Sequence, residues 1–550
     1  MTNKEIAQTF QLLASLMELH DGDPFRIRSY QFVYQNIKNL DQPLTEISSA
    51  EMAKIKGIGK SIASQITAYI ETGKLSALES LIEVTPPGLL QLIKMKGFGP
   101  KKIKQLWSEL GIETPGELLY AIQENRLLSL KGFGEKSQAE LLNQVLFLLS
   151  HENNFLYPEL LKESMAFQEI FKAVFPVFAI ELTGDIKRRL PFSDHIDFII
   201  DGIYTDIDLS KIPGIISFHW HSDRYEVLWK DVYKLNLYFS DKYQYINKQV
   251  LLTGNDTFIA SLSVNLVDSK TPDFKNETEL FSWLKTKVIP HELREYPIEE
   301  VSDDKLLNNL IQISDIRGVV HAHSRFSDGS NSMEEMAFSS EKEGYSFLVM
   351  TDHSQAAFYA NGLKWENIKQ QHAEIDALNL NNNNFRILKG IECDILSSGD
   401  LDYDDEILGT FEVVIASVHS LLKMNEERAM ARIIKAIENP FTHILGHPTG
   451  RLLLSRPGYP LDMKKIIDAC SANNVAIELN ANPRRLDVDW QWIPYAMEKM
   501  VLISINPDAH SIKGIQDIEY GVNMARKGKL TKECCLNALD ADSFLKALKK

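Results

Sequence analysis

The segment RGVVHAHSRFSDG, Arg317 to Gly329, joins a short β-branched run to side chains that bind metals. The run predicts a buried strand. His321 and His323 follow it two residues apart, so on an extended backbone both side chains point to the same side, and Asp328 comes shortly after. Imidazole suits Zn, Mn and Fe, and carboxylates suit Mn, so the segment indicates a strand that ends at a metal site.

Six more runs of this kind follow, each separated from the next by enough residues for a helix. Strands that alternate with helices form parallel sheets, and seven in succession favour a closed barrel. The six runs are SFLVM at 346–350, FRILKGI at 385–391, FEVVIAS at 411–417, THILG at 442–446, VAIEL at 475–479 and VLISI at 501–505.

Polar residues stand at the end of every run. The carboxyl ends of the strands of an α/β barrel meet at one face, where active sites lie, so six of the 14 histidines are expected to meet there. His372 and His443 lack this placement and are expected to be structural. The residues at the strand ends are His321, His323, Asp328, Asp352, His353, Glu392, His419, His447, Glu478, Asn480, Asp508 and His510.

The composition narrows the class of protein. No run reaches the roughly 18 apolar residues of a membrane helix, the N-terminus has no signal-peptide pattern, and the four cysteines form no CxxC pair, so we expect a cytoplasmic protein without a membrane partner. The net charge of −16 argues against non-specific coating of nucleic acid. Residues 1–150 are neutral, with 16 basic and 16 acidic side chains, and can still hold DNA locally.

A glycine turn occurs three times in the first 150 residues, as KIKGIGKSIA from Lys54, KMKGFGPKKI from Lys94 and SLKGFGEKSQ from Ser129. Each copy predicts helix, tight turn, helix. The glycines permit positive φ and let backbone N–H groups approach a phosphate at the positive end of the next helix. The expected DNA-binding residues are Gly57, Gly59, Lys60, Gly97, Gly99, Lys101, Lys102, Gly132, Gly134 and Lys136.

Between these regions, LTGDIKRRLPFSDHIDFII, Leu182 to Ile200, ends as a buried strand that places His195 and Asp197 on one face. Two carboxylates at this spacing would suit Mg²⁺. Here histidine replaces one of the two carboxylates, which leaves three interpretations. The strand is either a site for another metal, the remains of a Mg²⁺ site, or a strand with a polar edge.

Together these segments resemble a bacterial family X DNA polymerase, the family of DNA polymerase beta, fused to a PHP (polymerase and histidinol phosphatase) domain. The three turns and PFRIRSY at 24–30 resemble its N-terminal and fingers regions, and HAHSRFSDG, TDHS, GIECDIL, ASVHS, GHPTGR, ELNANPRRLD and NPDAH resemble the PHP motifs. The resemblance implies a multidomain α/β protein. Its expected parts are an all-α helix-hairpin-helix domain at 1–85, a fingers-like helix-hairpin-helix domain at 86–152, a degenerate α+β nucleotidyltransferase-like palm and thumb at 153–300, a linker at 301–316 and a PHP domain with a distorted (β/α)7 barrel at 317–550.

For the barrel, the resemblance implies three divalent ions, either Mn or Zn, with Fe as a further candidate. Glu392 would bridge two ions, and Asp328, His353 and His510 would hold the third and most exposed. Arg451, with Arg484 or Arg485, is placed to grip phosphate, and we expect Asp328, Glu392, Arg451 and Arg485 to take part in catalysis. The remaining implied ligands are His321, His323 and Asp508 on the first ion and His419 and His447 on the second.

For the palm, the resemblance places Gly184 and Asp185 on the glycine-serine pair that opens the polymerase site. His195, Asp197 and Asn236 then fall on its three aspartates. Only one carboxylate remains, so neither Mg²⁺ nor template-directed synthesis is expected there.

The implied function is metal-dependent 3′–5′ exonuclease action on gapped, nicked or 3′-ended DNA in repair, with abasic-site cleavage as an open addition. Three alternatives are retained. They are a gap-filling polymerase with a proofreading PHP domain, a small-molecule phosphatase of the histidinol phosphatase type, and a non-catalytic DNA-binding scaffold.

Overall fold

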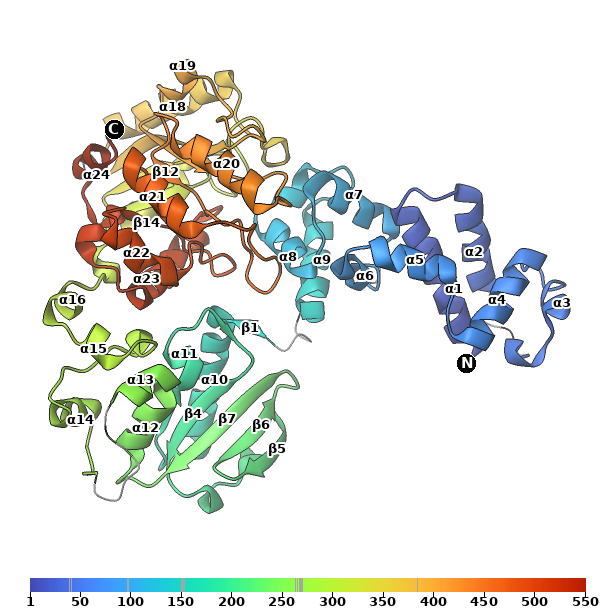
Figure 1. Ribbon diagram of the computed structural model, residues 1–550, viewed down its shortest axis with the longest axis horizontal. Coiled ribbons are helices and arrows are strands. Elements are labelled where there is room, and N and C mark those ends of the chain that lie inside the picture. The colour runs from blue at the N-terminus through green and yellow to red at the C-terminus, as the bar shows by residue number, and fades with distance from the viewer. Residues whose placement is uncertain are drawn as a thin grey trace. The chain divides into compact units, whose positions relative to one another are not determined.

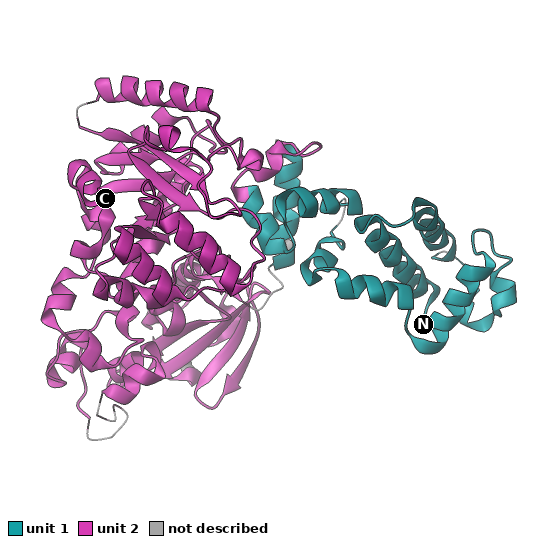
Figure 2. Ribbon diagram, turned by 45° about the horizontal axis from the view of Figure 1, so that its top comes forward, with its two compact units in different colours: residues 1–122, 136–149 teal, residues 123–135, 150–550 magenta. Residues whose placement is uncertain are grey.

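The computed structural model describes residues 1–38, 40, 42–95, 98–149, 154–262, 264, 266, 271–382 and 384–550. They form two compact units, residues 1–122 with 136–149 and residues 123–135 with 150–550 (Figure 2). Within these described ranges, no helix is both long enough and apolar enough to cross a membrane.

The N-terminal region is helical, as expected. α1 begins with a capping box between Thr2 and Glu5, which satisfies backbone N–H groups at the helix start. Ile6, Phe10 and Leu13 share its buried face. The helices up to residue 149 are α1 (Asn3–Leu19), α2 (Pro24–Ile37), α3 (Ser49–Met52), α4 (Lys60–Thr72), α5 (Ser76–Val84), α6 (Pro87–Leu92), α7 (Pro100–Leu110), α8 (Pro115–Gln123) and α9 (Glu135–Leu149).

The palm is a five-stranded sheet in the order β2-β4-β7-β6-β5, in which only β4 and β7 are parallel neighbours (Figure 1). Phe167 of α10 packs on Phe198 of β4 and Trp229 of β6, which fixes the helix on the sheet. The elements are β1 (Phe155–Leu156), α10 (Tyr157–Val174), β2 (Ile180–Thr183), α11 (Gly184–Lys187), β3 (Phe192–Ser193), β4 (Ile196–Asp201), β5 (Ile215–His221), β6 (Arg224–Trp229) and β7 (Tyr233–Ser240).

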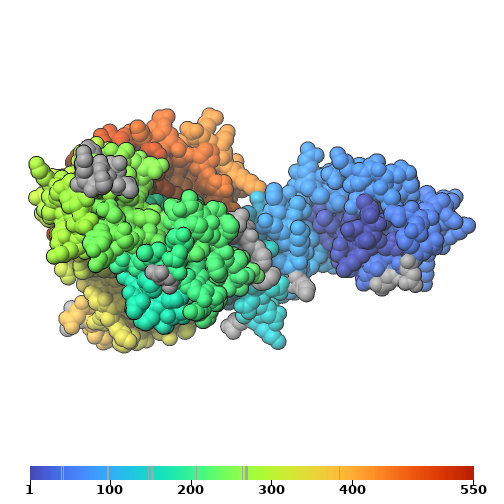
Figure 3. Space-filling model, turned by 90° about the horizontal axis from the view of Figure 1, so that it is seen from below, coloured from blue at the N-terminus to red at the C-terminus, as the bar shows by residue number. Residues whose placement is uncertain are grey.

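Five short helices follow the sheet and lead to the barrel within the same unit. Tyr296 donates its hydroxyl to the carbonyl oxygen of Lys527 (3.1 Å), and the Lys527 ammonium lies 2.8 Å from Glu295. The green surface of this region accordingly passes without a break into the orange-red surface of the barrel in Figure 3. The helices are α12 (Tyr245–Thr253), α13 (Asp256–Ser261), α14 (Glu277–Trp283), α15 (Ile298–Val301) and α16 (Asp304–Asn309).

All seven runs predicted as strands form one parallel sheet in the order β14-β13-β12-β11-β10-β9-β8, which confirms the prediction. The sheet nearly closes, because Ala509 accepts from the His323 N–H (2.9 Å) and donates to the His321 carbonyl (3.1 Å). The strands are β8 (Gly318–Ala322), β9 (Phe347–Met350), β10 (Arg386–Asp394), β11 (Val413–Ser417), β12 (Ile444–Leu445), β13 (Ala476–Asn480) and β14 (Ile503–Asn506).

Alternate residues of the strands face opposite sides of the barrel wall. One set, which includes Leu388 and Ala476, forms a hydrophobic cluster with Phe544, and the same face continues to Glu392 and Glu478 at the strand ends. The other set packs against the surrounding helices. These are α17 (Met333–Lys342), α18 (Trp365–Leu380), α19 (Asp405–Leu408), α20 (Glu426–Ile437), α21 (Met463–Asn473), α22 (Ile493–Glu498) and α23 (Ile518–Lys527). α24 (Ala541–Ala547), which carries Phe544, packs instead on the first set.

Candidate metal centre

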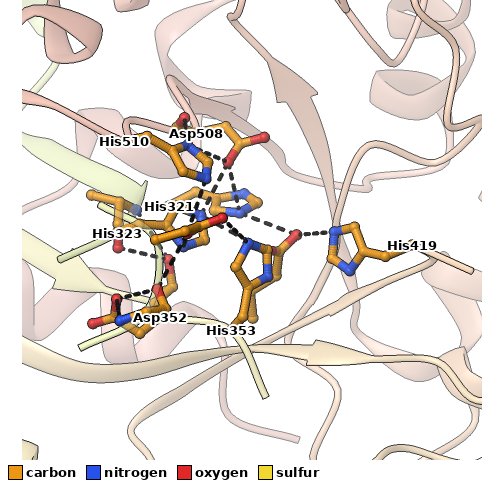
Figure 4. A network of polar contacts seen from close by, with 12 residues as sticks. His321, His323, Asp352, His353, His419, Asp508 and His510 are labelled. Atoms are coloured by element: carbon orange, nitrogen blue, oxygen red, sulfur yellow. Dashed lines mark hydrogen bonds and ion pairs between the residues drawn. The ribbon is translucent and has the colours of Figure 1, made fainter. Parts of the chain in front are cut away.

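Glu392, near the end of β10, is the centre of the cluster of polar side chains at the barrel mouth, where it meets His321, His353 and His419. Figure 4 shows these three histidines together with His323, Asp508 and His510. Glu392 Oε1 lies 3.0 Å from His447 Nε2, 3.1 Å from His419 Nε2 and 3.3 Å from His321 Nε2. Its Oε2 lies 2.8 Å from His353 Nδ1. One carboxylate thus touches imidazoles from the ends of four other strands.

Two aspartates extend the cluster. Asp508 Oδ1 lies 3.1 Å from His323 Nε2, and Asp328 lies 3.3 Å from His510 Nε2 and 3.5 Å from His353 Nε2. All nine expected ligands therefore converge. Three groups of them have ligand atoms within 4.8 Å of one another, namely His323 with Asp328, His353 and His510, then His321 with His323 and Asp508, and lastly His353 with Glu392 and His419.

Three of these residues have a positive φ, with His447 at 21° the least extreme. His321 has a φ of 67° and Asp508 a φ of 53°, in the left-handed region that side chains with a Cβ disfavour. Such strain persists where the surroundings impose it, and it clusters at functional sites. The closing contacts of the barrel hold both residues.

The unsatisfied polar atoms fit divalent ions. Nε2 of His321, Nε2 of His510 and Oδ2 of Asp328 are buried, and each has no hydrogen-bond partner among the described residues. An unpaired buried polar group costs about 1–3 kcal/mol. A donor set of imidazoles and carboxylates with free atoms that converge is suited to Mn²⁺, Zn²⁺ or Fe²⁺.

Glu392 and His323 have charge states that suit metal binding. Burial lowers the pKa values of His321, His353 and His510, but neighbouring carboxylates outweigh it and raise them. Burial alone would raise the pKa of Glu392, but His419, His321 and His353 outweigh it and hold that pKa well below its usual range. Burial and the neighbouring His510 and His353 lower the pKa of His323 to about 3. Glu392 is therefore ionised and His323 neutral at pH 7, as a metal ligand requires.

Two carboxylates outside the predicted ligand set orient ligand histidines. Glu478 Oε2 lies 2.6 Å from Nδ1 of His321, and Asp394 Oδ1 lies 3.3 Å from Nδ1 of His419. A carboxylate on the second ring nitrogen fixes the tautomer and aims the first nitrogen at the metal. The signal for Asp394 in the sequence is its i, i+2 spacing from Glu392, which places both on one face.

Asp352, at the end of β9, has a supporting role. It accepts hydrogen bonds from the Ser324 N–H (2.8 Å), the Ser324 hydroxyl (2.7 Å) and the Gln371 amide (2.6 Å). It therefore fixes the loop that follows His323.

The two arginines expected in catalysis differ in placement. The Arg451 guanidinium binds the Asp489 carboxylate (2.6 Å) and the carbonyl oxygens of Arg485 and Leu486, so its donors brace this loop, and its expected grip on phosphate stays a prediction. Arg485 is buried, with Nε 3.7 Å from Asp508 Oδ2. Only Arg485 lies beside a predicted ligand.

In the palm, the polymerase-like residues bind one another. Asp197 and Asn236 face each other on β4 and β7, and the Asn236 amide donates to Asp197 Oδ1 (2.8 Å). His195 Nε2 lies 3.1 Å from Asp197 Oδ2, and its Nδ1 lies 2.6 Å from Asp194. Both oxygens of Asp197 are thus engaged. The Gly184 backbone is so close that a Cβ there would lie 2.0 Å from Asp197 Oδ2.

The palm network predicts a pH dependence of stability. The hydrogen bond with Asp197 raises the pKa of His195 to about 9, from an ordinary value of 6.5, although burial opposes it. The stabilisation is complete below pH 6.5 and is lost as the pH rises through about 9. We expect the difference in Tm between wild type and His195→Gln to shrink from pH 6 to 9.5. A constant difference would contradict this, and the exposed His219→Gln is the control.

The predicted DNA-binding residues lie in turns that start helices. Gly59 and Gly99 are the N-caps of α4 and α7, with extended φ of −78° and −74°. Gly57 and Gly132, at 90° and 89°, are the positions that require glycine. Gly97 lies outside the described residues. Gly134 follows Gly132 in the third turn. Of the predicted lysines, Lys60, Lys101 and Lys136 are exposed and Lys102 is half-buried.

Known families and relatives match both ends of the chain. The helix-hairpin-helix domain matches residues 1–75, the SAM-like helix-hairpin-helix tandem matches residues 89–144, and the PHP domain matches residues 320–511. The DNA polymerase/3′-5′ exonuclease PolX of Bacillus subtilis (strain 168) is 34% identical over 572 aligned residues, which cover 99% of this chain and 100% of the relative.

Other relatives align over a shorter stretch, no longer than the barrel region. A probable phosphatase of Thermoanaerobacter sp. (strain X514) is 29% identical over 229 residues, 40% of this chain and 88% of that protein. A probable phosphatase of Acetivibrio thermocellus is 31% identical over 166 residues, 29% of this chain and 63% of that protein.

The fold, the candidate site and the family matches together define the class of this protein. It is an enzyme that joins helix-hairpin-helix domains to a PHP domain of the metal-dependent phosphoesterase type. Within this class, the chain belongs to the PolX family, the bacterial family X DNA polymerases that carry a PHP domain.

Proposed function

We propose that this protein is a metal-dependent 3′–5′ exonuclease that trims DNA ends, with its active site at the barrel mouth. The observation that carries the proposal is the convergence of nine imidazoles and carboxylates, seven of them buried and Asp328 and His419 half-buried, with unsatisfied atoms that face one another. The Bacillus subtilis relative, similar over the whole chain, is named for this activity.

The site proposal assigns three divalent ions, with Mn or Zn as the first candidates and Fe as another. Glu392 would bridge two, with His321, His323 and Asp508 on one side and His419 and His447 on the other. Asp328, His353 and His510 would hold the third. When bound, such ions activate water and stabilise charge on a phosphodiester. Arg485 is the side chain we propose for contact with the phosphate.

We further propose that DNA with gaps, nicks or 3′ ends is the partner, held through phosphates by the glycine turns and lysines of the first 149 residues. The space beside three of these glycines is open to a phosphate, since a Cβ on Gly59, Gly99 or Gly132 would meet no atom within 4 Å. The five parts with boundaries at residues 85, 152, 300 and 316 are retained as the proposed division of the chain.

The palm is proposed to bind DNA without polymerising it. Mg²⁺ needs free carboxylate oxygens, and both oxygens of Asp197 are engaged by Asn236 and His195. The hydrogen-bonded network takes the place of two-ion coordination, so we expect no nucleotide addition.

One gel tests both proposals. A 5′-labelled gapped DNA is incubated with Mn²⁺ and all four deoxynucleotides, with wild type or His323→Ala. We expect shortening by wild type alone and lengthening by neither protein. Lengthening that persists in His323→Ala would refute the inactive palm, and equal shortening by both proteins would refute the barrel nuclease.

A second candidate is a small-molecule phosphatase. It is favoured by the relatives named as probable phosphatases, whose alignments are no longer than the barrel region. Rapid release of phosphate from histidinol phosphate, together with no action on DNA, would establish it. A small-molecule phosphatase would have no use for the glycine turns in the first 149 residues.

A further inference from the structure

Residues 123–135 belong to the same compact unit as the barrel, although β8 begins far later in the chain. A 3-10 helix, not an α-helix, precedes the third glycine turn. The contacts to the barrel unit are Arg484 Nε to Gln123 Oε1 (2.8 Å), the Asn125 amide to Ser330 Oγ (2.8 Å), and the Arg126 guanidinium 5.0 Å from the centre of the Tyr359 ring.

Between these contacts, Glu124 reaches the candidate metal centre. It is only 4% exposed, and its Oε2 lies 2.5 Å from Nδ1 of His510. The other nitrogen of that ring, Nε2, points to Asp328 at 3.3 Å and has no hydrogen-bond partner in the described part of the chain. One nitrogen thus meets a carboxylate and the other remains for a metal.

Two other ligand histidines have the same arrangement. Glu478 meets Nδ1 of His321 and Asp394 meets Nδ1 of His419, but these carboxylates come from barrel strands. Glu124 comes instead from the segment before the third glycine turn. The orientation of His510 therefore depends on a part of the chain outside the barrel.

We propose that Glu124 is a positioning residue that aims His510 at the third metal ion, so that this ion binds fully only when residues 123–135 are seated on the barrel. The inference rests on the proposed metal centre. Loss of such an outer carboxylate typically weakens metal binding by about 10- to 100-fold. Binding of this ion and packing of residues 123–135 against the barrel would then stabilise each other.

The test is Mn²⁺ binding to the metal-free full-length protein, measured by calorimetry and electron paramagnetic resonance. In Glu124→Ala we expect one class of site to weaken by about 10- to 100-fold, with the others unchanged. Glu124→Gln keeps a hydrogen-bond acceptor without the charge, so it should recover part of the loss. Glu109→Ala, an exposed glutamate of α7, controls for charge.

A double-mutant cycle with His510→Ala separates positioning from other roles. If Glu124 acts through His510, the double variant binds Mn²⁺ no more weakly than His510→Ala alone. Additive losses would overturn the proposal. Wild type that binds no Mn²⁺ would instead refute the metal centre itself.

Discussion

Replacing Asp508 by asparagine is expected to slow hydrolysis of DNA 3′ ends by about 100- to 1,000-fold, because a bound ion supplies several kcal/mol of transition-state stabilisation. The substitution keeps the shape of the side chain and removes its charge. Asp508 Oδ1 lies 3.1 Å from His323 Nε2 and 3.4 Å from His321 Nε2, and Oδ2 accepts from the Asn480 amide at 3.1 Å. A neutral amide there would leave the first ion short of negative charge.

The measurement is single-turnover decay of a 5′-labelled oligonucleotide, with DNA affinity measured by fluorescence anisotropy. Affinity should be unchanged, because the proposed phosphate contacts lie in the glycine turns. Asp405→Asn, an exposed aspartate of α19, is the matched control and should behave as wild type. Undiminished hydrolysis by Asp508→Asn would remove the barrel from the reaction.

Replacing Glu478 by alanine is expected to destabilise the barrel by about 3–5 kcal/mol, because it breaks a buried charged network by removing one partner. The carboxylate is fully buried and contacts Nδ1 of His321 (2.6 Å), the His447 N–H (3.0 Å), and the amides of Asn480 (3.0 Å) and Asn506 (2.8 Å). The Asn480 amide would keep Asp508 Oδ2 as a partner, but all four groups would lose their hydrogen bond to Glu478 at a fully buried position.

For a domain of this size, the expected loss corresponds to a fall in Tm of about 10 °C, measured by calorimetry on the metal-free protein. Glu478→Gln should lose less, since the amide oxygen still accepts hydrogen bonds. Glu374→Ala, an exposed glutamate of α18, should leave Tm within the small range typical of surface substitutions. An unchanged Tm in Glu478→Ala would show that this carboxylate has no part in holding the strand ends together.

Much of the barrel could be predicted from local sequence. Each strand is a short run of β-branched and apolar residues, and the two-residue period fixes which side chain faces inward. Glu392 and Asp508 could therefore be assigned to the mouth from their places at strand ends alone. The contacts of Arg451 with Asp489 and Leu486 could not be predicted, because these partners lie in a loop whose path local pattern does not define.

The palm divides in the same way. From the sequence and the family resemblance, His195, Asp197 and Asn236 could be predicted to keep one of the three carboxylates of a polymerase site. That His195 and Asn236 occupy both oxygens of Asp197 depends on the parallel pairing of β4 and β7, which joins residues 39 positions apart.

The sequence by itself determined the helical N-terminal region, the seven strands and the nine imidazoles and carboxylates that converge at the strand ends, because periodicity, glycine turns and side-chain chemistry are encoded within a few residues. Only the tertiary structure decided which carboxylate orients which histidine. The contacts of Glu478 with His321 and of Glu124 with His510 join distant segments. Nothing local marks such a pair, since a buried glutamate is specified by the packing of several elements at once.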